Sequence, residues 1–108
     1  MNNTEKIKEL NDKLRSTGKG GRIMLTSGVL AQGQETAQQV LLLVKNYSNF
    51  TPDNDPYHEH DFGVINHNNI KYFWKIDYYD LACSMHSPDA SNPDVTIRVL
   101  TLLLAEEY

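Results

Sequence analysis

The sequence predicts one small α+β domain, in two layers, with helices packed on a short mixed or antiparallel sheet. A length of 108 residues suits a single domain over residues 1–108. Hydrophobic residues make up 40% of the chain and charged residues 22%, which is typical of a globular protein. Segments of helical and strand-like periodicity follow one another in the order α-β-α-β-β-α, and this order indicates helices covering a sheet.

The first helix is predicted over residues 4–16 and the first strand over residues 22–26. Apolar side chains recur at helical spacing at Ile7, Leu10 and Leu14. Gly18 then ends the helix, because glycine is the residue that most often follows a helix C-terminus. The short apolar run RIMLT fits a strand that ends at Ser27 and Gly28.

A second helix is predicted over residues 34–48, with a wide apolar stripe. The stripe consists of Ala37, Val40, Leu41, Val44 and Tyr47. Leu42 and Leu43 widen it, so we expect this helix to be deeply buried.

A hairpin is predicted from residues 62–66 and 70–80, after a polar loop over residues 51–61. The turn at His67–Asn69 suits a tight hairpin, because asparagine tolerates a positive φ. In the second strand, large apolar side chains alternate with polar or aromatic ones, which is the period of a strand. We expect one face of that strand to pack in the core through Tyr72, Trp74 and Ile76.

The last element is predicted to be a helix that follows a loop over residues 81–93. Asn92-Pro93-Asp94 has the residue types that begin helices. The buried stripe of this helix is predicted as Val95, Val99, Leu102 and Leu103.

Charge is unevenly distributed along the chain. Residues 1–49 carry seven Lys/Arg against four Asp/Glu, whereas residues 50–94 carry two against eight. The single cysteine, Cys83, allows no intrachain disulfide. The chain has no apolar run near the roughly 20 residues that span a membrane, and its charged N-terminus is unlike a signal peptide. We therefore expect a cytoplasmic protein without membrane contact.

The loop over residues 51–61 is the main candidate site. It holds six ionisable groups, at Asp53, Asp55, His58, Glu59, His60 and Asp61. In an extended segment His58 and His60 would face the same way and could bind a metal, with Asp77 or Asp80 adding a carboxylate. The alternative is loop architecture or a binding surface, because no specific metal motif is present. We favour that alternative and expect no metal and no cofactor.

Other chemistries have weaker signals. Cys83 and His86 have the residue types of a nucleophile and its base but no defining context. Gly28 and Gly33 lie between a strand and a helix but lack the other residues of a phosphate-binding loop. The aromatic residues of the hairpin could stack on bases, but their surroundings are acidic, so we expect no direct nucleic-acid binding. Tyr79 remains the candidate for an exposed contact.

Three blocks of the sequence resemble one uncharacterised bacterial family, domain of unknown function 3768. These blocks are NDPYHEHDFG (Asn54–Gly63), KIDYYD (Lys75–Asp80) and TIRVLTLLLAEEY (Thr96–Tyr108), and GRIMLTSGVL (Gly21–Leu30) is similar as well. The resemblance runs from about residue 11 to residue 108 and implies a gene found often on plasmids and other mobile elements. It implies no activity. At position 58 members usually have a small residue, so His58 departs from the family pattern and the two-histidine metal site loses support. The residues that remain for such a site are His60, Asp61, Asp77 and Asp80.

Two functions remain open. The first is a non-catalytic protein-binding module, and a candidate inhibitor of a host defence system of anti-CRISPR or antirestriction type, that meets a basic partner through an acidic surface. Its predicted surface consists of Asp53, Asp55, Glu59, His60, Asp61, Asp77, Tyr79 and Asp80. The alternative is a small metal- or His/Asp-dependent enzyme for an anionic substrate, with His60 as base and Lys75 or Arg98 as anion clamp. Lys75 and Arg98 could instead pair internally with Asp77 or Glu59.

Overall fold

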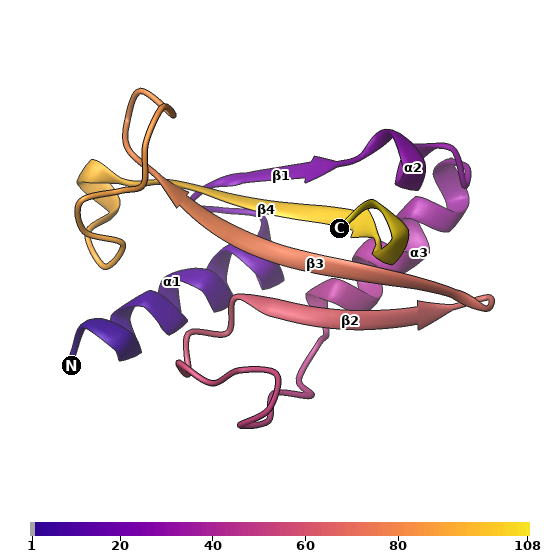
Figure 1. The fold of residues 1–108 in the computed structure, drawn as a ribbon, viewed down its shortest axis with the longest axis horizontal. Helices are drawn as coiled ribbons and strands as arrows, with labels where there is room; N and C mark the ends of the chain where they lie inside the picture. The colour runs from indigo at the N-terminus through magenta and orange to yellow at the C-terminus, as the bar shows by residue number, and fades with distance from the viewer. Residues whose placement is uncertain (1) are drawn as a thin grey trace.

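A four-stranded mixed sheet forms the centre of the protein, in a computed structural model that describes residues 2–108. The strand order is β1-β4-β3-β2 (Figure 1). The strands are β1 (Arg22–Leu25), β2 (Phe62–His67), β3 (Ile70–Tyr79) and β4 (Ile97–Leu104). β1 runs parallel to β4, and the other two pairings are antiparallel. The predicted α+β fold with a mixed sheet is confirmed.

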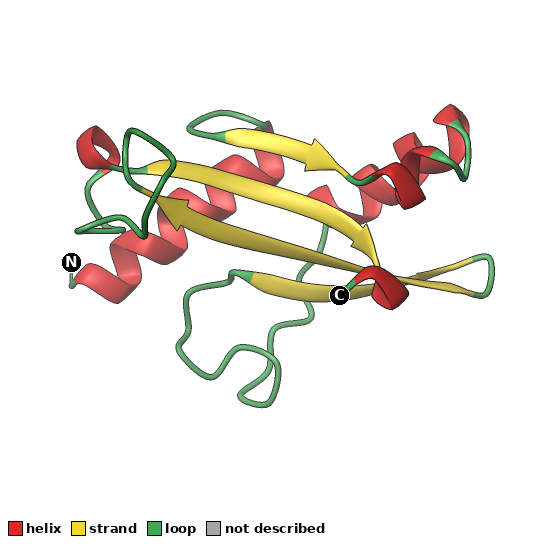
Figure 2. Cartoon of the chain, turned by 45° about the horizontal axis from the view of Figure 1, so that its top comes forward, coloured by secondary structure: helices red, strands yellow, loops and turns green. Residues whose placement is uncertain are grey.

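Helices cover one face of this sheet. They are α1 (Asn3–Thr17), the short α2 (Ser27–Leu30) and α3 (Gln34–Lys45). Figures 1 and 2 show α1 and α3 on the same side of the strands. α1 begins at Asn2, whose side chain accepts from the Glu5 N–H, and ends at Gly18 with φ 77°. α2 was not expected, because a single turn leaves too short a pattern to recognise.

The core lies between the helices and the inner face of the sheet. Tyr72, Trp74 and Ile76 are buried there, as the alternation in β3 predicts. They pack with residues of α3 and β4, namely Val40, Val44, Leu100, Leu102 and Leu104. The expected deep burial of α3 is wrong at two positions, since Leu42 is 58% exposed and Leu43 42% exposed. Only one stripe of this helix faces the sheet.

The β2–β3 hairpin has the tight turn that the sequence predicts. Asn68 and Asn69 both have positive φ, at 50° and 64°. Gly63 on β2 makes room for the core, because a Cβ there would come within 2.7 Å of the Trp74 ring and 2.8 Å of Tyr47. Gly63 therefore leaves room for the indole of Trp74, its cross-strand partner on β3.

The predicted last helix is wrong, because residues 97–104 form the central strand β4. Asn92 does cap a turn, accepting from the Asp94 N–H, but that turn is the short 3₁₀ helix η1 (Pro93–Val95). β4 lies between β1 and β3 and is apolar on both faces. A continuous apolar run fits helical and strand patterns equally well, so its periodicity could not decide between them. The chain then ends in a second 3₁₀ helix, η2 (Ala105–Glu107).

The other face of the sheet carries no helix along most of its length, and we name it the open face. On β3 it presents Phe73, Lys75, Asp77 and Tyr79, all half-buried. Figures 1 and 2 show the C-terminal turn η2 lying over this side, and Figure 2 shows the loop after β3 passing in front of one end of the strands. Tyr108 packs there against Phe62 and Phe73, with ring centroids 6.3 and 5.3 Å apart.

Candidate functional site

The loop over residues 51–61 is a compact structure held by its own side chains. Asn54 accepts from the Thr51 N–H at 2.8 Å and donates to the Asn49 carbonyl at 2.8 Å. Asp55 is buried and accepts from the His60 N–H at 3.0 Å. His58 and His60 both adopt positive φ, at 60° and 56°, so the segment is not extended. The two imidazoles therefore do not share the strand-like arrangement on which the two-histidine metal hypothesis depends.

His60 fastens this loop to α1. Its Nδ1 lies 2.9 Å from Asp12 Oδ1, and its Nε2 lies 3.6 Å from Asp55 Oδ2. The imidazole stacks on Phe50 with ring centroids 3.7 Å apart and an interplanar angle of 3°. Both ring nitrogens thus face carboxylates of the protein itself, and the ring stabilises the loop.

Glu59 belongs to a polar network inside the protein. The Tyr78 hydroxyl donates to Glu59 Oε1 at 2.8 Å, and Asn11 Nδ2 donates to the Glu59 carbonyl at 3.0 Å and to Tyr78 Oη at 2.8 Å. Arg98 Nε donates to Asn11 Oδ1 at 2.6 Å, and another Arg98 nitrogen donates to the Ala90 carbonyl. The network joins α1, β3, β4 and the loop.

Burial in this network changes the pKa of two groups. Arg98 is 1% exposed, and burial lowers the pKa of its guanidinium, while Tyr78 and Glu59 act in the opposite direction. Burial also raises the pKa of Tyr78 far above its usual value, so its hydroxyl stays protonated and keeps donating. Arg98 therefore acts as an internal support and is not positioned as an anion clamp.

A hollow of about 320 Å³ brings together three of the predicted surface residues at one end of the sheet. Asp61, Asp77 and Tyr79 line it with His86, over a floor that includes Ile76. Tyr79 and His86 come together because their backbones form an isolated antiparallel bridge. We name this hollow the acidic end.

The carboxylates of the acidic end lie in a negative environment. The pKa of Asp61 is raised, chiefly by burial and then by the charge of Glu59, with Asp55 and Asp77 contributing in the same direction. Asp77 pairs with Lys75 on the open face at 2.7 Å, which is the alternative pairing that the sequence left open for that lysine. Lys75 thus offsets the charge of one carboxylate, whereas Asp61 has no ion pair among residues 2–108.

The remaining acidic candidates lie outside the acidic end. Asp80 Oδ1 accepts from the Ser84 N–H at 3.0 Å and the Met85 N–H at 3.4 Å, and these bonds lower its pKa. Asp80 therefore shapes the next loop. Asp53 is exposed near the start of the loop over residues 51–61.

Within residues 2–108, no group of three or more His, Cys, Asp or Glu side chains is arranged to hold a metal ion. Cys83 is exposed, and no hydrogen bond joins it to His86 in this part of the chain. The Gly28 N–H, which begins α2, already donates to Glu107 Oε2 at 3.2 Å. That carboxylate occupies the place where a phosphate would bind, so Gly28 and Gly33 do not form a phosphate loop.

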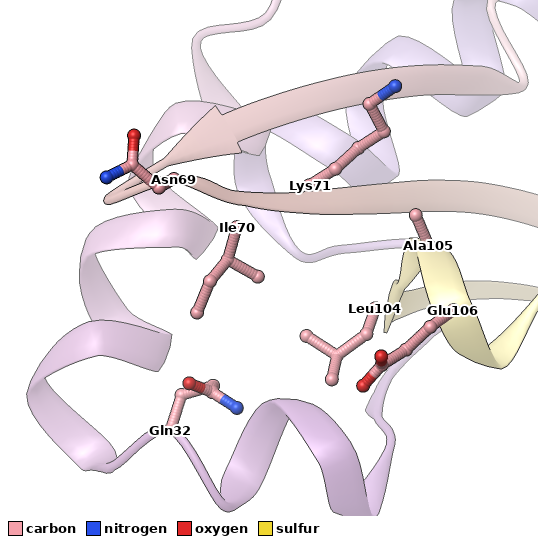
Figure 3. A pocket seen from close by; sticks show the side chains of 7 residues that line it. All are labelled: Gln32, Asn69, Ile70, Lys71, Leu104, Ala105 and Glu106. Atoms are coloured by element: carbon pink, nitrogen blue, oxygen red, sulfur yellow. The ribbon is translucent and has the colours of Figure 1, made fainter.

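A second pocket, of about 330 Å³, lies at the opposite end of the sheet (Figure 3). Figure 3 shows Ile70 and Leu104 within it, with Lys71 and Glu106 around them. Neither pocket is much larger than the other, and both open to solvent. No deep cleft for a small substrate is therefore distinguished among the described pockets.

Sequence reasoning missed two residues that define this region, Asn11 and Asp12, and it considered Tyr78 and His86 only in other roles. Asn11 had a signal, because it lies on the apolar stripe of α1 between Ile7 and Leu14, where a polar residue needs a buried partner. Asp12 had none, since its partner His60 lies 48 residues away in the sequence.

The family described as a protein of unknown function, DUF3768, matches residues 25–107. This span contains the loop over residues 51–61, β2, β3 and β4, so it includes most of the polar network and the acidic end. No curated protein and no solved structure matches the chain. In the described part of the chain, the helices are too short or too polar to span a bilayer.

Proposed function

The chain belongs to the DUF3768 family, and from its structure we propose that it is a non-catalytic module that binds a protein with a basic surface. The observation that carries this proposal is the acidic end, where Asp61 and Asp77 line one solvent-open hollow with Tyr79. A tyrosine beside carboxylates suits a lysine- or arginine-bearing partner, because the ring supplies contact area and the charges attract the cation.

The charge balance around Asp61 supports the same partner. Burial and three neighbouring carboxylates raise the pKa of Asp61, which means that its ionised form is disfavoured in the free protein. A cation from a partner would offset that repulsion and stabilise the ionised form. Binding energy is therefore available at this position without a change in the fold.

We further propose that the partner belongs to a host defence system. Nucleic-acid-binding proteins of such systems carry basic grooves for phosphates, and a small acidic protein can occupy such a groove. The net charge of −4 and the concentration of acidic residues in the middle of the chain support this choice. The alternative, a His/Asp-dependent enzyme, has less support because both nitrogens of His60 already face Asp12 and Asp55.

The test is affinity capture from a bacterial lysate with wild-type protein and the D61N/D77N variant. We expect the variant to retain its fold and to lose about tenfold or more of the captured partner, the change that corresponds to about 1.4 kcal/mol. The matched control is D53N/D94N, which removes the same two charges from exposed positions outside the acidic end. Equal capture by all three proteins would contradict the proposal.

A further inference from the structure

β1 forms one edge of the sheet and presents unpaired backbone groups (Figure 1). In its parallel pairing with β4, the Thr26 N–H donates to the Leu102 carbonyl at 3.1 Å. Alternate residues of a strand direct their backbone groups to opposite sides, so Met24 also faces β4. The backbone N–H and C=O groups of Ile23 and Leu25 therefore point away from β4, toward the outside of the sheet edge. Edges of this kind accept an additional strand from another chain.

An apolar groove of about 240 Å³ lies beside this edge, on the helix side of the sheet. Ile23, Leu41, Val44 and Leu100 contribute its apolar surface, at the point where the C-terminal ends of α1 and α3 approach β1. A strand added to β1 would direct every second side chain toward the helices. One such side chain would enter this groove.

The polar lining of the groove is basic. Arg15 and Lys45 line it together with Ser16 and Thr17, and no carboxylate is among the lining residues. Arg15 donates to three carbonyls at and just after the end of α3, those of Val44, Lys45 and Tyr47, so it offsets the negative end of that helix. It also pairs with Asp12 Oδ1 at 3.1 Å, so Lys45, which is exposed, is the cation of the lining that has no carboxylate partner among the described residues. The side chain of Arg15 is 8% exposed, and its Nε has no acceptor among the described residues.

We propose that the β1 edge and this groove bind an extended segment of a partner protein, one that alternates apolar with acidic residues. The free backbone groups of Ile23 and Leu25 would hold its main chain, and the groove would hold an apolar side chain. Lys45, exposed at the groove rim, would favour a carboxylate beside it, and the unpaired Nε of Arg15 could donate to the same segment. This site has the opposite charge from the acidic end, and the inference does not depend on the function proposed for that end.

The first experiment titrates isotope-labelled protein with a seven-residue peptide that alternates glutamate with leucine or valine. We expect amide chemical-shift changes at Ile23 and Leu25, and slower hydrogen exchange of these two amides on binding. The Met24 amide already lies in the ladder with β4, so its exchange should change little. A peptide with lysine in place of glutamate should bind about tenfold or more weakly.

Two neighbouring substitutions separate the groove from the open face. Ile23→Lys places a charge at the groove, whereas Met24→Lys places the same charge on the other side of β1, at a residue that is 54% exposed. We expect the first to abolish peptide binding and the second to leave it unchanged. Lys45→Glu, at the groove rim, should weaken binding of the glutamate peptide and strengthen that of the lysine peptide.

Three results would overturn the inference. The first is the absence of shift changes at Ile23 and Leu25 at millimolar peptide. The second is equal loss of binding in Ile23→Lys and Met24→Lys. The third is a concentration-dependent dimer, seen by sedimentation without peptide, that protects the same amides, because the occupant of the edge would then be a second copy of the chain.

Discussion

Asn11 connects three parts of the protein through one side-chain amide. It accepts from Arg98, donates to Tyr78 and to the Glu59 carbonyl, and is fully buried. Because each of these groups is removed from water, none can replace its partner with solvent. The same reasoning explains why Asp55, Glu59 and His60 serve the scaffold although they were predicted as surface.

Asn11→Ala should lower the free energy of unfolding by about 2–3 kcal/mol, because it leaves a charged buried donor unpaired. The measurement is urea denaturation followed by tryptophan fluorescence. Lys13→Ala, at an exposed position on the same helix, should change stability by less than about 0.5 kcal/mol. Equal effects of the two substitutions would mean that Arg98 finds another acceptor.

Trp74→Ala should cost about 3–5 kcal/mol, as expected for loss of a large buried aromatic side chain. The indole is fully buried and packs edge-on against Tyr47 and Phe50, with ring centroids 5.4 and 6.1 Å apart. Phe73→Ala, on the opposite face of β3, should cost less. Denaturant melts followed by circular dichroism measure both, and a loss below 1 kcal/mol for Trp74→Ala would contradict the observed facing of β3.

At the scale of the element, β4 is the segment whose secondary structure the sequence misrepresents. Its stripe of Val99, Leu102 and Leu103 suits a helix, whereas in the sheet Leu100 and Leu102 face the core. Apolar residues stand on both faces of β4, because Leu100 and Leu102 face the core while Leu103, 5% exposed, lies on the opposite face beside its cross-strand partner Phe73.

Leu100→Ala should therefore cost about 2–5 kcal/mol and Val99→Ala markedly less, within the range for deleting buried methyl groups. Leu100 is almost fully buried, and Val99 is half-buried on the open face. Thermal melts of both variants measure the difference. A larger loss of stability for Val99→Ala than for Leu100→Ala is what a helix over these residues would give, and it would contradict the strand.

The junction between β4 and α2 depends on one carboxylate, Glu107. It accepts from the Thr26 hydroxyl at 2.6 Å, the Leu104 N–H at 2.7 Å and the Gly28 N–H, and these bonds lower its pKa. A lowered pKa in the folded state gives stability that is fully present above the ordinary carboxyl value of 4.5 and is lost as pH falls through the folded value.

We therefore expect the melting temperature to fall as the pH is lowered from 6 to 3, and Glu107→Gln to reduce the part of that fall due to this residue. Asp80 and Asp89, whose pKa values are also lowered, should account for part of the remainder. Asp61 has a raised pKa, so its contribution to the melting temperature changes with pH in the opposite direction. If the curves of melting temperature against pH were parallel for wild-type protein and Glu107→Gln, the stabilising role assigned to the Glu107 carboxylate would be contradicted.

At the scale of the whole molecule, the two candidate surfaces differ in charge. The acidic end contains Asp61 and Asp77, whereas the groove beside β1 contains Arg15 and Lys45. This separation follows the excess of basic residues in the first 49 positions and of acidic residues in the next 45.

The fold should be stable without a metal. Chelator should leave the melting temperature unchanged and added divalent metal should not raise it, because a ligand that binds only the folded state would raise it. This expectation rests on the surroundings of His60, whose ring nitrogens lie 2.9 Å from Asp12 and 3.6 Å from Asp55. A stoichiometric metal in the purified protein, by elemental analysis, would contradict it.

The sequence by itself determined the α1 helix, the β2–β3 hairpin and the core face of β3, because their patterns are local: helical spacing, an Asn-Asn turn and strict alternation. It also identified Asp61, Asp77 and Tyr79, which the fold brings together. Only the tertiary structure decided that residues 97–104 form a strand and that Asp55 and His60 face inward. The physical reason is that β4 depends on hydrogen bonds to two strands, and His60 on Asp12 from a distant helix, and neither partner is visible in a local pattern.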